Sequence, residues 1–127
     1  MGATRSSYRY YSVRGGRPLQ GEVAVGGAKN AGPQLLIASL LSSQVSVLEN
    51  MPRTREVDIT LSICSSIGVT WEWLDANTLQ IDPSKLSEFR IPDADSRANR
   101  SSILFVAPLL ARLDAAQIAA VGGDALG

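Results

Sequence analysis

Two short polar segments stand where a helix is expected to begin. Lys29 and Asn30 precede the apolar run 35–41, and Arg100 precedes a similar run at 104–110. The N-terminus of a helix favours anions because backbone N–H groups point out of its first turn. A lysine and an arginine at two such starts therefore favour a site for a phosphate-bearing ligand.

Both cations also have a purely structural interpretation. Lys29 alone is typical of a solvated lysine that precedes a helix. At about 100° per residue, Arg100 shares its helical face with four apolar residues: Ile103, Leu104, Ala107 and Ala111. We expect this stripe to be buried, so Arg100 would either extend its charge to solvent or pair with an acid. The recurrence of the pattern favours the anion site over these alternatives.

The composition excludes several kinds of catalytic pair, metal site and disulfide. The chain has no histidine, which excludes Ser–His and Cys–His pairs and the usual zinc sites, and no metal site is expected. Its one cysteine, Cys64, cannot form an internal disulfide and fits a reducing compartment. Because Cys64 lies on the apolar face of a predicted helix, we interpret it as a core residue and not as a nucleophile.

Charge and hydropathy give no sign of a nucleic-acid or membrane partner. Twelve basic and twelve acidic residues cancel over 127 residues, and no apolar run is long enough to cross a bilayer. The N-terminal segment "MGATRSSYRYYSVRGGR" lacks the apolar core of a secretory signal. We therefore expect a cytoplasmic protein with one modest domain.

The segments around Lys29 and Arg100 lie in a chain that is predicted to alternate between strands and helices. Asn30 and Thr54 are predicted to cap the N-termini of the helices that follow them, and Gly68 is predicted to end the second helix. Pro108 is expected to interrupt the third helix. Trp71 and Trp73 share one strand face and are expected to pack, with sugar stacking as the alternative. The predicted strands are 22–25, 45–50, 69–73, 78–82 and 116–121, and the predicted helices are 30–42, 54–67 and 96–113.

The order β-α-β-α-β-β, followed by α-β, indicates a repeated unit. A single shift along the chain places "LLIASLL" (35–41) on "LFVAPLL" (104–110) and Asn30 on Asn99. Because the polar starts and the following strands agree as well, the spacing supports an internal repeat.

Four segments together resemble the enolpyruvyl transferases. They are "LQGEVAVGGAKNA", "NMPRTREVD", "ANRSSILFVAPLLAR" and the terminal "GGDALG". The nearest branch uses UDP-N-acetylglucosamine as acceptor, in the synthesis of peptidoglycan precursors. The resemblance runs from about Pro18 to the end of the chain.

The resemblance implies an α/β (α+β) fold. Family members form two inside-out barrels of repeated βαβαββ units, with helices inside and sheets outside, and are several times longer than this chain. We therefore expect an N-terminal fragment with one complete unit and part of a second. Residues 1–22 would hold the lead-in and first strand of the other domain, and 23–127 a partial transferase domain. Exposed apolar edges are expected if the fragment is made alone.

The resemblance also implies roles for four residues. Lys29 matches the lysine that contacts the phosphate and carboxylate of phosphoenolpyruvate, and Asn30 the asparagine that hydrogen-bonds the sugar. Arg100 matches an arginine of the nucleotide-sugar and phosphoenolpyruvate site. Asp124 stands where family members carry a cysteine or an aspartate on a loop, and would protonate C3 of phosphoenolpyruvate; by itself it is typical of a turn. The implied reaction moves the enolpyruvyl group to the 3′-hydroxyl of UDP-N-acetylglucosamine, releases phosphate and needs no cofactor.

Departures from the family pattern leave two alternatives open. The chain stops before the next loop arginine and acid–base aspartate of the family, so we expect it to be inactive alone. Pro33 comes one residue early, and Arg97 stands where lysine is common. The alternatives are a paralogue that acts on another nucleotide in secondary metabolism and a non-catalytic remnant that binds a nucleotide sugar.

Overall fold

A three-stranded antiparallel sheet forms one layer of the protein. The structure is a computed structural model that describes residues 10–98 and 100–119. The strands are β1 (Ser46–Leu48), β2 (Thr70–Trp73) and β3 (Leu79–Asp82), in the order β1-β3-β2. Since β3 is antiparallel to both neighbours, β1 and β2 run parallel with β3 between them. The strands predicted at 45–50, 69–73 and 78–82 are confirmed, each with shorter bounds.

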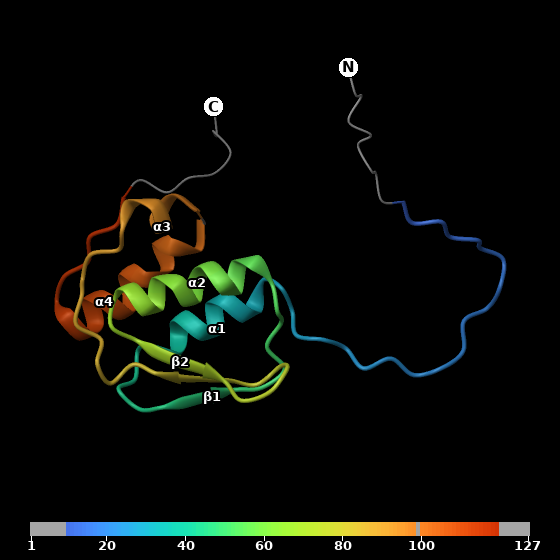
Figure 1. The fold of residues 1–127 in the computed structure, drawn as a ribbon, viewed down its shortest axis with the longest axis horizontal. Coiled ribbons are helices and arrows are strands. Elements are labelled where there is room, and N and C mark those ends of the chain that lie inside the picture. The colour runs from blue at the N-terminus through green and yellow to red at the C-terminus, as the bar shows by residue number, and fades with distance from the viewer. Residues whose placement is uncertain (1–9, 99, 120–127) are drawn as a thin grey trace, which may run out of the picture.

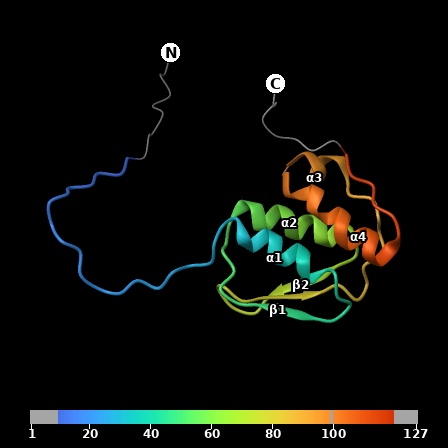
Figure 2. The same cartoon turned by 180° about the vertical axis from the view of Figure 1, so that it is seen from behind.

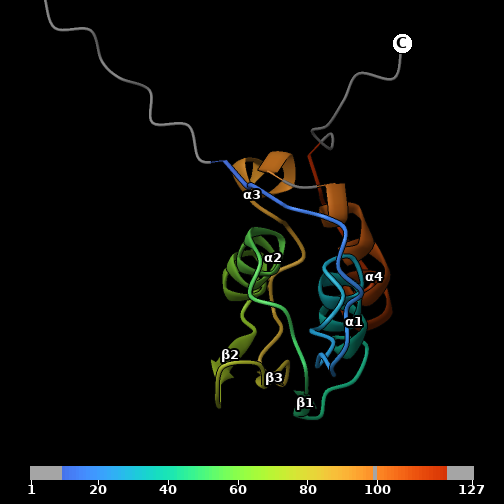
Figure 3. The same ribbon diagram turned by 90° about the vertical axis from the view of Figure 1, so that its right-hand side faces the viewer.

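Two helices cover one face of this sheet. α1 (Ala31–Ser39) and α2 (Arg55–Ser66) lie side by side above the strands (Figures 1 and 3). The predicted cap of α2 is confirmed, because the Thr54 hydroxyl accepts the backbone N–H of Val57 at 3.4 Å. The helix ends as predicted before Gly68, whose φ of +91° favours glycine.

The C-terminal helical region is divided into three elements. They are α3 (Asp93–Ala98), the 3-10 helix η1 (Arg100–Phe105) and α4 (Val106–Leu113). The prediction of one helix over 96–113, interrupted at Pro108, is therefore wrong. Pro108 lies in the first turn of α4, where its missing N–H costs nothing. The regular α-helix is already replaced before α4 by the 3-10 helix η1, in which the Ser102 hydroxyl donates to the Ser96 carbonyl at 2.9 Å.

The buried face of residues 100–113 differs from the predicted one. The residues predicted to form a buried stripe are all exposed: Arg100, Ile103, Leu104, Ala107 and Ala111. The buried positions are instead Ser102, Phe105, Pro108 and Leu109. At 100° per residue, Ser102, Phe105 and Leu109 share the helical face opposite to the predicted stripe. The expected burial was therefore wrong in the choice of face.

The internal repeat is supported by the burial of equivalent positions. Leu36 and Phe105, which the shift between the two units superimposes, are both fully buried, as are Leu40 and Leu109. Leu35 and its equivalent Leu104 are both exposed. Since α1 also packs against η1, corresponding side chains of the two units meet in one core.

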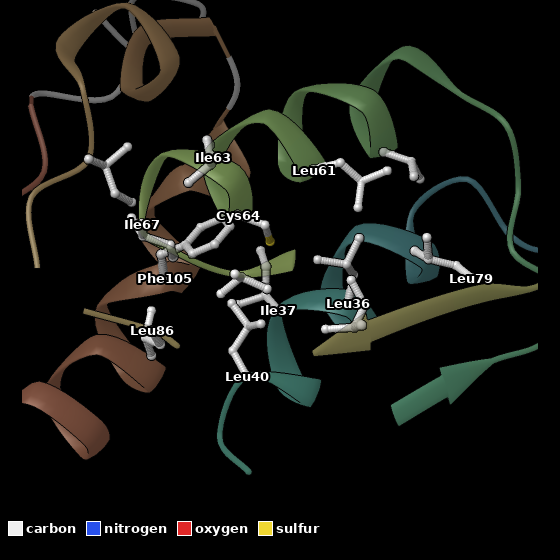
Figure 4. Packing of buried hydrophobic residues seen from close by; sticks show 14 of the residues in the cluster. Leu36, Ile37, Leu40, Leu61, Ile63, Cys64, Ile67, Leu79, Leu86 and Phe105 are labelled. Carbon is white, nitrogen blue, oxygen red and sulfur yellow. The ribbon is translucent and has the colours of Figure 1, made fainter. Parts of the chain in front are cut away.

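The core lies between the sheet and the helices (Figure 4). It contains Cys64, which is fully buried, and desolvation raises the pKa of its thiol. The interpretation of Cys64 as a core residue is thus confirmed. The predicted packing is confirmed for Trp73, which lies against the core. It is wrong for Trp71, which is 38% exposed and whose indole donates to the Ser65 hydroxyl at 2.9 Å.

The two outer strands of the prediction are not formed as expected. Residues 10–28 contain neither helix nor strand, and they extend away from the sheet and helices (Figures 1 and 2). The strand predicted at 22–25 is therefore wrong, because no described strand lies beside it to pair with. Of the strand predicted at 116–121, Gln117 forms a single bridge with Arg90, and 120–121 lie outside the described residues. No helix in the described ranges is both long and apolar enough to span a membrane.

Candidate anion-binding site

Lys29 lies in a turn immediately before α1 and pairs with the start of α2. Its ammonium Nζ is 3.0 Å from Glu56 Oε1. The Lys29 side chain is 63% exposed and that of Glu56 is 37% exposed, so both groups remain open to solvent. The first turns of α1 and α2 therefore meet at a corner that carries one ammonium and one carboxylate.

Two glycines allow this corner to form. A Cβ on Gly27 would overlap the backbone carbonyl oxygen of Asn50 and lie 2.9 Å from Pro52 Cδ. A Cβ on Gly32 would lie 3.0 Å from the Pro52 ring. The side-chain amide of Asn50 also donates to the Val25 carbonyl at 3.3 Å. The glycines before and inside α1 thus serve the close approach of its first turn to the loop that leads into α2.

Glu56 is a partner of Lys29 that was not predicted from the sequence. The hydrogen bond from Lys29 is the largest cause that lowers the pKa of this carboxyl below its ordinary value, and its backbone hydrogen bond adds to the effect. An acid in the first turn of a helix capped by Thr54 is a common pattern, since it complements the helix dipole. Because this local role already accounts for Glu56, the sequence gives no sign of its ion pair with Lys29, which forms only in the folded chain.

Asn30 precedes α1 but does not cap it. Its backbone is helical (φ −82°, ψ −27°) and its side chain makes no capping hydrogen bond, so the predicted cap is wrong. The backbone N–H groups of Ala31 and Gly32 donate instead to the Ala28 carbonyl at 3.2 and 3.0 Å, and Pro33 has no N–H. Because the turn at Ala28 uses these donors, an anion at this corner would bind side chains and not the first N–H groups of α1.

Arg100 is the first residue of η1, and its side chain is exposed. The element that carries it packs against α1 and α2. Lys29 and Asn30 are adjacent in sequence and lie together at the start of α1. Asp124, the predicted proton donor, lies outside the described residues.

Two other arginines have structural roles. The Arg53 guanidinium stacks 3.4 Å from the Trp73 ring centroid and donates to the carbonyls of Ala76 and Asp75 at 2.8 and 3.1 Å. Arg112 donates to the carbonyls of Leu40, Ser42 and Pro83 at distances from 2.9 to 3.3 Å. Because these contacts tie the β2–β3 turn and the end of α1 to their neighbours, neither arginine is a candidate for ligand binding.

Comparison with known proteins identifies the family. Residues 13–127 match the EPSP synthase (3-phosphoshikimate 1-carboxyvinyltransferase) family. The UDP-N-acetylglucosamine 1-carboxyvinyltransferase of Idiomarina loihiensis is 40% identical over 117 residues, which are 92% of this chain and 28% of the relative. The enzyme of the same name from Gloeobacter violaceus is 40% identical over 118 residues, 93% of this chain and 26% of the relative. The chain thus spans about a quarter of the length of these relatives.

The solved structures confirm the predicted fold. The enolpyruvyl transferase NikO from Streptomyces tendae superposes with a TM-score of 0.64 at 23% identity, over 76% of this chain and 22% of NikO. At that identity the likeness concerns the fold alone, and the matched region is part of a domain. Taken with the sequence match over residues 13–127, it leads to one conclusion: the chain belongs to the EPSP synthase family of carboxyvinyltransferases.

Proposed function

We propose that this chain forms part of the substrate site of an enzyme that transfers an enolpyruvyl group. The donor is phosphoenolpyruvate and the acceptor is the 3′-hydroxyl of UDP-N-acetylglucosamine; phosphate is released, in the synthesis of peptidoglycan precursors. The observation that carries the proposal is the solvent-open ammonium of Lys29 at the corner between α1 and α2. The shared name of the two 40% identical relatives supports the choice of acceptor.

The four predicted residues have distinct proposed roles. Lys29 binds the phosphate and carboxylate of phosphoenolpyruvate, a dense anion that needs cationic partners. The amide of Asn30, which makes no capping hydrogen bond, hydrogen-bonds the sugar, and Arg100 binds the nucleotide sugar and phosphoenolpyruvate. Asp124 donates the proton that C3 of phosphoenolpyruvate must gain, which requires a carboxyl pKa raised toward neutrality.

The chain spans about a quarter of the length of the relatives that it matches, so we propose that it supplies only part of the cleft. We propose that residues 23–127 form part of one transferase domain and that 1–22 belong with the other. The lack of any strand or helix at 10–28, where Val23 and Val25 are 88% and 85% exposed, fits a segment whose sheet partners are not among the described residues. Because the reaction depends on holding two substrates together, we expect no turnover from the 127-residue chain alone.

A second candidate function is transfer to a different nucleotide. Arg97, in place of the common lysine, is exposed on α3. This element lies beside η1, which begins with Arg100. A cation changed from ammonium to guanidinium alters which hydrogen bonds an acceptor can make, so another nucleotide is the favoured alternative. A remnant that binds a nucleotide sugar without catalysis is the third candidate.

A composite enzyme tests these proposals. In it, this chain replaces the segment that it matches in the Idiomarina loihiensis relative. We expect the composite enzyme to release phosphate from phosphoenolpyruvate with UDP-N-acetylglucosamine and not with other uridine or cytidine nucleotides, while the chain alone releases none. Turnover only with another nucleotide would establish the second function. A folded composite that binds UDP-N-acetylglucosamine without turnover would establish the third.

A further inference from the structure

We propose that Glu56 is a positioning residue of the anion site, which holds the Lys29 ammonium at the corner between α1 and α2. This inference rests on the proposed function, because it takes Lys29 as a ligand for phosphoenolpyruvate. It adds Glu56 to the proposed site as a residue that positions Lys29. Glu56 would touch Lys29 and not the substrate.

The geometry supports this role because each partner is held by its own element. Glu56 lies in the first turn of α2, which Thr54 caps. Lys29 lies in the turn that the close approach of Gly27 to Asn50 fixes. The backbone positions on both sides of the 3.0 Å contact are therefore defined. The flexible part between them is the long Lys29 side chain, and the contact with Glu56 restrains it.

The contact leaves Lys29 able to bind an anion. An ammonium group has three N–H donors, and the single contact with Glu56 Oε1 occupies one of them. The remaining donors can bind a phosphate or carboxylate while Glu56 stays in place. With the Lys29 side chain already restrained, less ordering entropy is lost when the ligand binds.

The negative charge of Glu56 should weaken anion binding, whereas its hydrogen bond with Lys29 should strengthen it. A suitable pair of variants separates these two effects. A carboxylate near the site repels an incoming anion. Glu56→Gln and Glu56→Ala both remove that charge, but only glutamine keeps an oxygen that accepts a hydrogen bond from Lys29. A difference between the two variants therefore reports on positioning and not on charge. Asp58→Asn and Asp58→Ala form the matched control pair, since Asp58 is an exposed acid in the same first turn.

The experiment titrates phosphoenolpyruvate into the chain and its variants, with binding followed by amide chemical shifts. We expect Glu56→Gln to bind about fivefold more tightly than Glu56→Ala, the contribution of one hydrogen bond. The two Asp58 variants should bind equally. In the Lys29→Ala background, phosphoenolpyruvate should cause no saturable shifts with either glutamine or alanine at position 56, because the ammonium that both variants would position is absent.

A second readout needs no ligand. Carbon-13 chemical shifts of the Glu56 carboxyl should give a lowered pKa in the unchanged chain, and Lys29→Ala should raise it. Equal affinities for the glutamine and alanine variants, or a Glu56 pKa that does not respond to Lys29→Ala, would refute the positioning role. If the unchanged chain binds phosphoenolpyruvate through Lys29 in that case, the proposed function still stands. If it does not bind at all, both proposals fall.

Discussion

We expect Lys29→Ala to lower phosphate release by the composite enzyme by about 100-fold or more. The physical reason is that Lys29 is proposed to neutralise the transferred group, and the loss of one aimed donor at such a site costs about 10²–10³ in rate. Steady-state phosphate release at saturating UDP-N-acetylglucosamine measures the effect. The Michaelis constant for phosphoenolpyruvate should also rise, because the ground state loses the same contact.

Lys85→Ala is the matched control, since it removes the only other lysine of the chain. Lys85 is exposed in the loop after β3 and lies outside the proposed site. We expect this variant to keep the turnover of the unchanged composite enzyme. Comparable losses from both lysine variants would show that the anion site is assigned to the wrong place.

We expect Gly27→Ala to destabilise the chain and to weaken its binding of phosphoenolpyruvate. The new Cβ would overlap the Asn50 carbonyl oxygen, so the turn before α1 must move away from the loop before α2. Overpacking of this kind costs about 1–3 kcal/mol in the free energy of unfolding. A shift of Lys29 away from Glu56 should follow. Thermal unfolding and phosphoenolpyruvate titration of the chain measure the two effects.

Gly26→Ala serves as the control for this variant. A Cβ on Gly26 would meet no atom within 4 Å, so the same added methyl should change neither unfolding nor binding. An unfolding temperature for Gly27→Ala that equals that of Gly26→Ala would mean that the first turn of α1 does not depend on the close approach to Asn50.

The elements with local causes could be predicted from the sequence. Thr54 and Gly68 mark the ends of α2 because capping and positive φ are properties of single residues. The β2–β3 turn is equally local, since Asp75 Oδ1 accepts the N–H groups of Asn77 and Thr78 at 2.8 Å each. These features need no information about distant parts of the chain.

Features that depend on tertiary contacts could not be predicted in this way. The buried face of residues 100–113 is one case: both faces carry apolar residues, and the packing of η1 against α1 and α2 leaves Arg100 exposed. The partner of Lys29 is a second case. The motif indicated an anion site, but Lys29 and Glu56 are far apart in the sequence, and only the folded corner shows that they meet.

The anion site itself is tested most directly by titration of the isotope-labelled chain with phosphoenolpyruvate. We predict saturable amide shifts that are largest at residues 29–32 and at the start of α2, near Glu56, and that are lost in Lys29→Ala but retained in Lys85→Ala. Inorganic phosphate should cause weaker shifts at the same residues, because it lacks the carboxylate. Shifts that do not saturate, or that persist unchanged in Lys29→Ala, would contradict the assignment of this corner as the phosphoenolpyruvate site.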